Sequence, residues 1–129
     1  MSFNILIVDD SRTIRAVIKK TLSIANVPVG ELYEAENGKI ALDIMKDKWV
    51  DLVFADINMP VMTGVEMVDK MAEDQLLEKL PVIIVSTEGS KSRIDQLINK
   101  GVKAFVKKPI TPEQLTNVVK LVMGDYDEA

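Results

Sequence analysis

Short apolar runs alternate with stretches of helical hydrophobic periodicity five times along the chain. Four continuous runs lie at residues 5–8, 50–55, 82–85 and 104–106, and a segment of alternating polarity lies at 31–35. Apolar runs of this length are typical of parallel strands buried on both faces, and the periodic segments between them are typical of crossover helices. The pattern therefore predicts an α/β fold in which helices cover both faces of a doubly wound parallel sheet.

Turn residues and helix caps set the expected limits of these elements. Thr111 is expected to be the N-cap of the last helix because Pro112 follows it in the first turn, and Gly101 and Gly124 are expected to end the last two helices. The segment 31–35 has the alternation of an edge strand. The expected helices cover about residues 11–26, 40–45, 65–74, 91–100 and 112–123.

Composition limits the classes of protein to which the chain can belong. Its 129 residues predict a single domain over 1–124, followed by a short, polar and frayed tail at 125–129. It has no cysteine and no histidine, which excludes a thiolate or histidine metal site and a phosphohistidine formed by the chain itself. A net charge of −4 argues against nucleic-acid binding, and no apolar stretch reaches the roughly 20 residues of a membrane span. We expect a cytoplasmic protein.

Polar residues follow four of the predicted strands, each at the point where the strand ends. They are Asp9, Asp10, Asp56, Ser86 and Lys108. The carboxyl ends of parallel strands meet at one edge of a sheet, so three carboxylates, a hydroxyl and an ammonium group are expected to lie together. Mg²⁺ takes oxygen ligands, a carboxylate can attack phosphorus without a general base, and a lysine can bind a phosphoryl oxygen. The set suits a magnesium ion and a phosphoryl group.

Each piece taken alone also has a purely structural interpretation. The pair Asp9-Asp10 could simply turn the chain and cap the helix that begins near Ser11, and Ser86 could simply end a buried strand. A Lys108-Pro109 pair is often a solvated lysine followed by a turn. The functional interpretation depends on the joint pattern.

The order, flanking strands and spacing of these motifs resemble the response-regulator receiver domains of the chemotaxis CheY type, from Asn4 to about Met123. The resemblance implies a flavodoxin-like, five-stranded parallel sheet in the order 2-1-3-4-5. It also implies that Asp56 is the phosphoacceptor of a two-component system. The residues implied to bind Mg²⁺ are Asp9, Asp10, Asp56 and, through its backbone carbonyl, Asn58.

The same resemblance implies how the phosphoryl group is recognised and lost. Ser86 is the switch hydroxyl, where many members have threonine, and Lys108 is the phosphate-binding lysine, with a cis bond to Pro109. Asn58 and Glu88 flank the path of the attacking water and tune autodephosphorylation.

Phe105 takes the aromatic switch position, where it can exchange between buried and exposed rotamers but offers no hydroxyl. The expected output face comprises the fourth helix, the last strand and the last helix. Its basic residues are Lys91, Arg93, Lys100, Lys103 and Lys107. An acidic segment of a target protein is the expected partner on this face, although the same lysines could merely keep it soluble.

These features favour a signalling switch that is not an enzyme and that receives its phosphoryl group from the phosphohistidine of a sensor histidine kinase. A phosphate sink that drains a shared kinase remains an alternative with the same chemistry. A magnesium-dependent aspartyl-phosphate phosphatase is disfavoured because Asn58 stands where such an enzyme has a second acid, and a flavodoxin-like mononucleotide binder is disfavoured because acidic residues follow the first strand. A monomer is expected, with dimerisation on phosphorylation left open.

Overall fold

A sheet of five parallel strands organises the computed structural model, which describes residues 2–128. The strands are β1 (Phe3–Val8), β2 (Val29–Ala35), β3 (Leu52–Ala55), β4 (Val82–Ser86) and β5 (Ala104–Lys107). Their order in the sheet is β2-β1-β3-β4-β5, and every neighbouring pair is parallel. The predicted fold class and strand order are thus confirmed, and β2 is an edge strand as expected.

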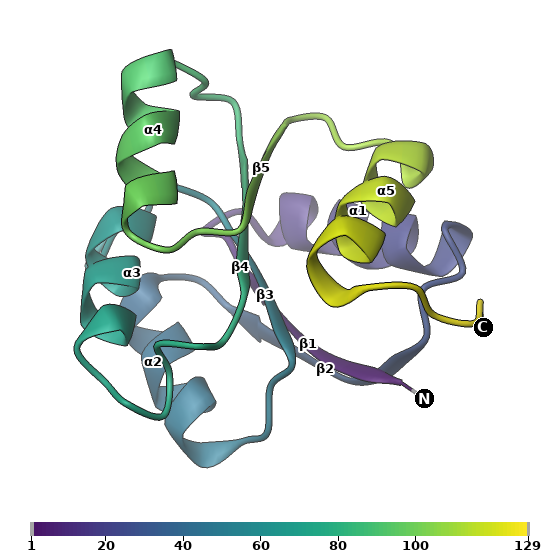
Figure 1. Ribbon diagram of the computed structural model, residues 1–129, viewed down its shortest axis with the longest axis horizontal. Helices are drawn as coiled ribbons and strands as arrows, with labels where there is room; N and C mark the ends of the chain where they lie inside the picture. Colours follow the sequence, from purple (N-terminus) through teal and green to yellow (C-terminus); the bar gives the residue numbers. More distant parts are fainter. Residues whose placement is uncertain (1, 129) are drawn as a thin grey trace.

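Helices cover both faces of this sheet (Figure 1). They are α1 (Arg12–Ile24), α2 (Gly38–Asp47), α3 (Gly64–Ala72), α4 (Lys91–Asn99) and α5 (Pro112–Met123). Helices α2, α3 and α4 pack on one face, and α1 and α5 pack on the other. Within residues 2–128, no helix is both long and apolar enough to cross a membrane.

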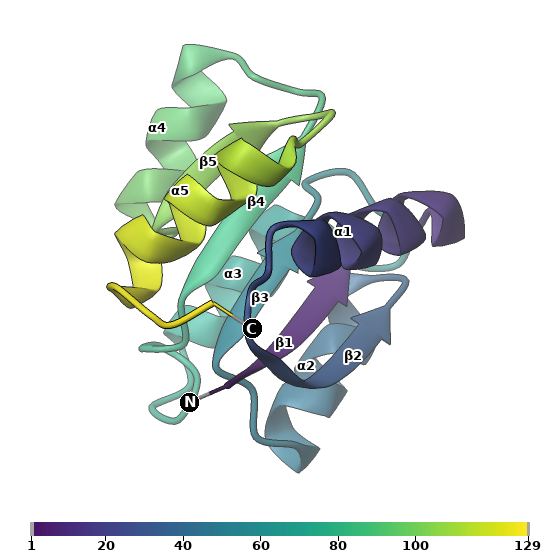
Figure 2. The same ribbon diagram turned by 90° about the vertical axis from the view of Figure 1, so that its right-hand side faces the viewer.

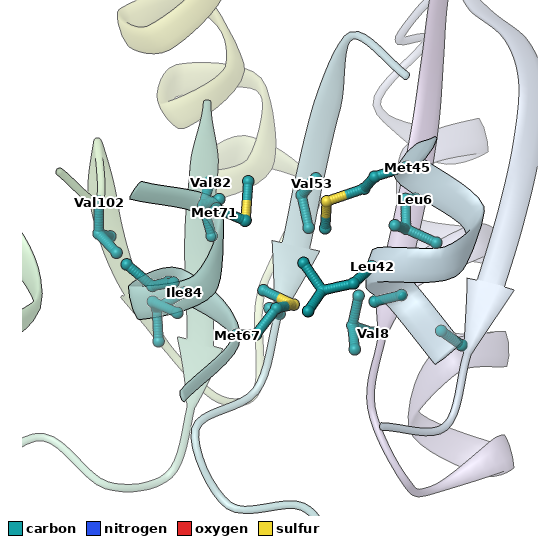
Figure 3. Packing of buried hydrophobic residues seen from close by; sticks show 14 of the residues in the cluster. Leu6, Val8, Leu42, Met45, Val53, Met67, Met71, Val82, Ile84 and Val102 are labelled. Carbon is teal, nitrogen blue, oxygen red and sulfur yellow. The ribbon is translucent and has the colours of Figure 1, made fainter. Parts of the chain in front are cut away.

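Successive side chains of the central strands enter opposite cores, as the pleat of a strand requires. Leu6 of β1 faces the core under α2 and α3, whereas its neighbours Ile5 and Ile7 face the core under α1 and α5. Figure 3 shows Met67 and Met71 of α3 between the helices and the sheet, where both are almost fully buried. These methionines, close to the loop that follows Asp56, therefore serve packing, as their adaptable side chains allow.

Some predicted element limits are wrong by one or two residues. Strand β2 begins at Val29, earlier than the predicted residue 31, because Val29 pairs with Phe3 of β1. Helix α3 begins at Gly64 because a capping box between Thr63 and Glu66, which the sequence analysis did not use, satisfies its first turn. The predicted ends of α1 and α3 are each two residues too late.

The C-terminal segment contains an anchored aromatic ring. Tyr126 packs edge-on against Phe3, with ring centroids 5.5 Å apart and planes at 90°. The ammonium group of Lys120 lies 5.6 Å from the centroid of the same ring. This apolar contact with the first strand is one that a composition-based expectation overlooked, and fraying of the tail stays a prediction.

Candidate functional site

The register of β1 and β3 brings three carboxylates together. Val8 pairs with Ala55, so the residues that follow them, Asp9 and Asp56, leave neighbouring strands at the same level of the sheet. One carboxylate oxygen from each of Asp9, Asp10 and Asp56 lies within 4.8 Å of the other two. Asp9 is buried, with 1% of its surface exposed, whereas Asp10 is exposed at the rim.

Lys108 reaches this cluster from the end of β5, the edge strand two positions from β3. It follows β5, yet its Nζ donates to Asp9 Oδ2 at 2.8 Å and to Asp56 Oδ2 at 3.0 Å. Burial by itself lowers the pKa of Lys108, but the hydrogen bonds and charges of the two carboxylates outweigh it, and the pKa is raised above its ordinary value of 10.5. Lys108 is therefore cationic at neutral pH and offsets part of the acidic charge.

Backbone donors fix the other oxygens of two carboxylates. Asp9 Oδ1 accepts from the Ser11 amide at 2.9 Å, and Asp56 Oδ1 accepts from the Ile57 amide at 2.7 Å. The N-cap of α1 is Ser11, whose hydroxyl oxygen accepts from the Ile14 amide. Helix capping therefore does not account for Asp10, and it leaves Asp9 Oδ2 to face Lys108.

A close backbone approach explains the glycine that ends the loop after Asp56. The Gly64 amide donates to the Ile57 carbonyl at 2.8 Å, which folds the loop back on the end of β3. A Cβ atom at position 64 would collide with the backbone carbonyl of Asp56. Only glycine fits this approach, so Gly64 shapes the backbone at Asp56 without contributing a side chain.

Ser86 is the last residue of β4, and Glu88 lies in the loop that follows it. Ser86 is buried, and its Oγ accepts from the Glu88 amide at 3.2 Å. The Glu88 carboxylate accepts from Arg93 Nε at 3.2 Å and from Asn58 Nδ2 at 3.1 Å. Arg93 foremost, and then Asn58, lower the pKa of Glu88. Arg93 is predicted from the sequence only as a residue of the output face, because no local pattern encodes its contact with Glu88.

Phe105 lies half-buried on β5 beside the core under α3 and α4. A hollow of about 370 Å³ opens next to it, lined by residues of β5 and α5 that include Lys107, Gln114 and the exposed Leu121.

Two of the five predicted basic residues are engaged in ion pairs within the protein: Lys100 pairs with Asp69 at 2.6 Å, and Arg93 pairs with Glu88. The other three, Lys91, Lys103 and Lys107, are exposed.

The donor set fits a magnesium ion. Mg²⁺ prefers oxygen ligands, retains several waters and needs only one or two carboxylates in addition to a phosphate oxygen. Asp9, Asp10 and Asp56 offer oxygens close enough to share one ion, and the exposed Asp10 leaves room for water. The resemblance also implied the Asn58 carbonyl as a ligand, which stays a prediction.

The Lys108–Pro109 peptide bond is cis, as the resemblance implied.

A flavodoxin-like sheet that carries an acidic cluster and a lysine at its carboxyl edge defines the receiver class of signalling proteins. The family model for the response regulator receiver domain matches residues 5–120, and the chain belongs to that family. Members of this family act as phosphorylation-dependent switches in two-component signalling, and the chain shares that general role.

The most informative relatives are chemotaxis proteins. The chain is 37% identical over 121 residues to the chemotaxis protein CheY homolog of Campylobacter jejuni, covering 93% of this chain and 92% of that protein. It is 36% identical over 126 residues to chemotaxis protein CheY1 of Helicobacter pylori, covering 95% and 98%. Among solved structures, chemotaxis response regulator CheY4 of Vibrio cholerae superimposes with a TM-score of 0.83 at 30% identity, covering 95% and 99%.

Proposed function

We propose that Asp56 accepts a phosphoryl group from the phosphohistidine of a sensor histidine kinase, with Mg²⁺, and that the charged domain then changes its affinity for a target protein. One observation supports this proposal above the others. The Asp56 carboxylate lies within 4.8 Å of two further acidic oxygens and 3.0 Å from the ammonium group of Lys108. A nucleophile, an oxygen-rich cation site and a countercharge thus share one pocket.

The transfer follows from these groups. The ionised Asp56 oxygen attacks phosphorus, a P–O bond forms, and the P–N bond breaks with its electron pair returning to the imidazole nitrogen of the kinase. Lys108 supplies positive charge for one phosphoryl oxygen. Ser86 can turn its hydroxyl to donate a hydrogen bond to a second phosphoryl oxygen. Asp9, Asp10 and Asp56 would hold Mg²⁺, which would supply positive charge on the acidic side of the site.

Phosphorylation of purified protein tests the assignment of the acceptor. Phosphoramidate with Mg²⁺ is expected to add one phosphate to the wild type and none to Asp56→Asn, because the amide is neither anionic nor nucleophilic. Asp43→Asn is a matched control, since Asp43 is an exposed carboxylate on α2 away from the pocket. Intact-mass measurement reports the result, and equal labelling of wild type and Asp56→Asn would remove Asp56 as the acceptor.

The output is proposed to leave through the face formed by α4, β5 and α5. As Ser86 turns toward the phosphoryl group, Phe105 moves inward, and packed interiors respond to such a vacancy in discrete steps. Lys103 and Lys107 remain exposed there and suit an acidic segment of the target.

Backbone chemical shifts with and without phosphorylation test this output route. Changes are expected to extend from Ser86 to Phe105 and α4. Changes confined to the acidic pocket would favour a phosphate sink that drains the kinase without engaging a target.

A further inference from the structure

Three side chains from separate elements form a continuous bar beside the acidic pocket. Asn58 follows β3 by three residues, Glu88 lies in the loop after β4, and Arg93 lies in the first turn of α4. Both carboxylate oxygens of Glu88 are occupied, one by Asn58 at 3.1 Å and the other by Arg93 at 3.2 Å. The bar therefore links the loop that follows Asp56 to helix α4.

Arg93 is the fixed end of this bar. Its amide donates to the Ser90 N-cap hydroxyl oxygen at 3.3 Å, and its Nη1 donates to Gln96 Oε1 at 3.1 Å, so backbone and side chain are both held on α4. The guanidinium fork keeps one direction when it binds a carboxylate, which a flexible ammonium group does not.

Glu88 needs such a partner because it lies near other negative charge. The Asp56 carboxylate repels the Glu88 carboxylate, and the Arg93 guanidinium, 3.2 Å from Glu88 Oε1, supplies the opposite charge. With the guanidinium removed, repulsion from the acidic pocket would favour a Glu88 side chain turned out to solvent, because about a third of that side chain is already exposed. Asn58 would then lose its acceptor.

We propose that Arg93 is a positioning residue that sets the lifetime of the phosphoryl group on Asp56, by holding the Glu88 carboxylate against Asn58 across the water route to the pocket. This inference rests on the proposed function. In the hydrolysis, a water oxygen attacks phosphorus in line with the bond to Asp56. That P–O bond breaks with its electron pair returning to the carboxylate, and the water proton leaves with phosphate or to solvent. A closed bar narrows the approach of this water.

The lifetime can be measured after loading with phosphoramidate and Mg²⁺ and rapid removal of the donor. Arg93→Ala is expected to lose phosphate at least about three times as fast as the wild type. The effect is moderate because the change alters the access of water to the phosphoryl group and leaves the reacting groups in place. Arg93→Lys restores a cation without the fork and is expected to decay at an intermediate rate. Lys20→Ala removes one positive charge from an exposed position on α1 and serves as the matched control.

A double-mutant cycle with Glu88→Ala separates positioning from a general charge effect. If Arg93 acts through Glu88, the double variant decays no faster than Glu88→Ala alone. Decay of Arg93→Ala at the wild-type rate, or an equal acceleration by Arg93→Ala in the Glu88→Ala background, overturns the proposal. Failure of the wild type to take up phosphate at all would instead contradict the proposed function, so the two failures are distinguishable.

Discussion

Helices α4 and α5 lie on either side of β5, but the protein holds them by different means (Figure 2). Helix α5 buries Leu115, Val118 and Val119 and begins with a capping box and a proline in its first turn. Among the nine residues of α4, only Leu97 is buried. Burial of large apolar side chains is the main source of helix stability in a folded domain, so α4 is the easier of the two to displace.

Polar links at its two ends hold α4 in addition to Leu97. Arg93 pairs with Glu88 near the N-terminus of the helix, and Lys100 pairs with Asp69 of α3 near its C-terminus. Partly exposed ion pairs add little to stability because solvent screens them. They can nevertheless fix orientation, and the first of them connects α4 to the pocket. The difference between the helices teaches that the fold places its weakly anchored helix where a change at Ser86 and Glu88 can reach it.

Truncating the buried leucine of each helix gives the largest expected effect. Leu115→Ala is expected to lower the free energy of unfolding by about 2–5 kcal/mol, because the cavity lies in the shared core under α1 and α5. Leu97→Ala is expected to release α4 locally and to cost less in global stability. Denaturant unfolding and amide hydrogen exchange measure the two effects. Equal losses of global stability would show that α4 is as firmly anchored as α5.

Magnesium is expected to increase the difference in stability between α5 and α4. An ion that binds only the folded protein, at the ends of β1 and β3, is expected to stabilise the native state by about 2.7 kcal/mol when its free concentration is one hundred times its dissociation constant. The slowest-exchanging amides of α5, which report global unfolding, should slow accordingly, while local opening of α4 stays unchanged. Asp10→Asn should abolish the response, and Asp43→Asn should retain it. Undiminished stabilisation of Asp10→Asn by Mg²⁺ would remove Asp10 from the ligand set.

Phosphorylation is expected to change α4 more than α5. Loading Asp56 should alter exchange rates of α4 amides by about tenfold, which corresponds to about 1.4 kcal/mol in local stability. Lys108→Ala should still accept some phosphate, since Asp56 and its acidic neighbours remain, but the change in α4 should shrink because the charge that senses the phosphoryl group is gone. A full α4 response in Lys108→Ala would show that Lys108 serves the transfer rather than the signal.

The helix caps give the smallest and most local comparison. Thr111→Ala removes one half of a capping box and is expected to cost about 1 kcal/mol of global stability, because α5 is part of the cooperative core. Ser90→Ala removes the N-cap of α4. It should mainly raise exchange in the first turn of that helix, with little shift in the unfolding midpoint. A comparable midpoint shift for both variants would contradict the difference in anchoring.

Local patterns in the sequence were sufficient for much of the fold. A strand buried on both faces needs an apolar run, and a crossover helix needs an apolar stripe. Residues 5–8 and 82–85 therefore predict their strands without reference to distant residues. Gly101, with φ of 103°, ends α4 in the left-handed conformation that favours glycine. The strand order came from the resemblance to a family, because alternation alone does not fix which strands are neighbours.

The candidate site divides in the same way. The sequence by itself determined that carboxylates, a hydroxyl and a lysine follow buried strands, because a parallel sheet collects strand ends at one edge. Only the tertiary structure decided that Lys108 touches Asp9, 99 residues away, and that Arg93 turns toward Glu88 rather than toward a partner. The physical reason is that such contacts depend on sheet register and side-chain reach, which arise only when distant segments pack together.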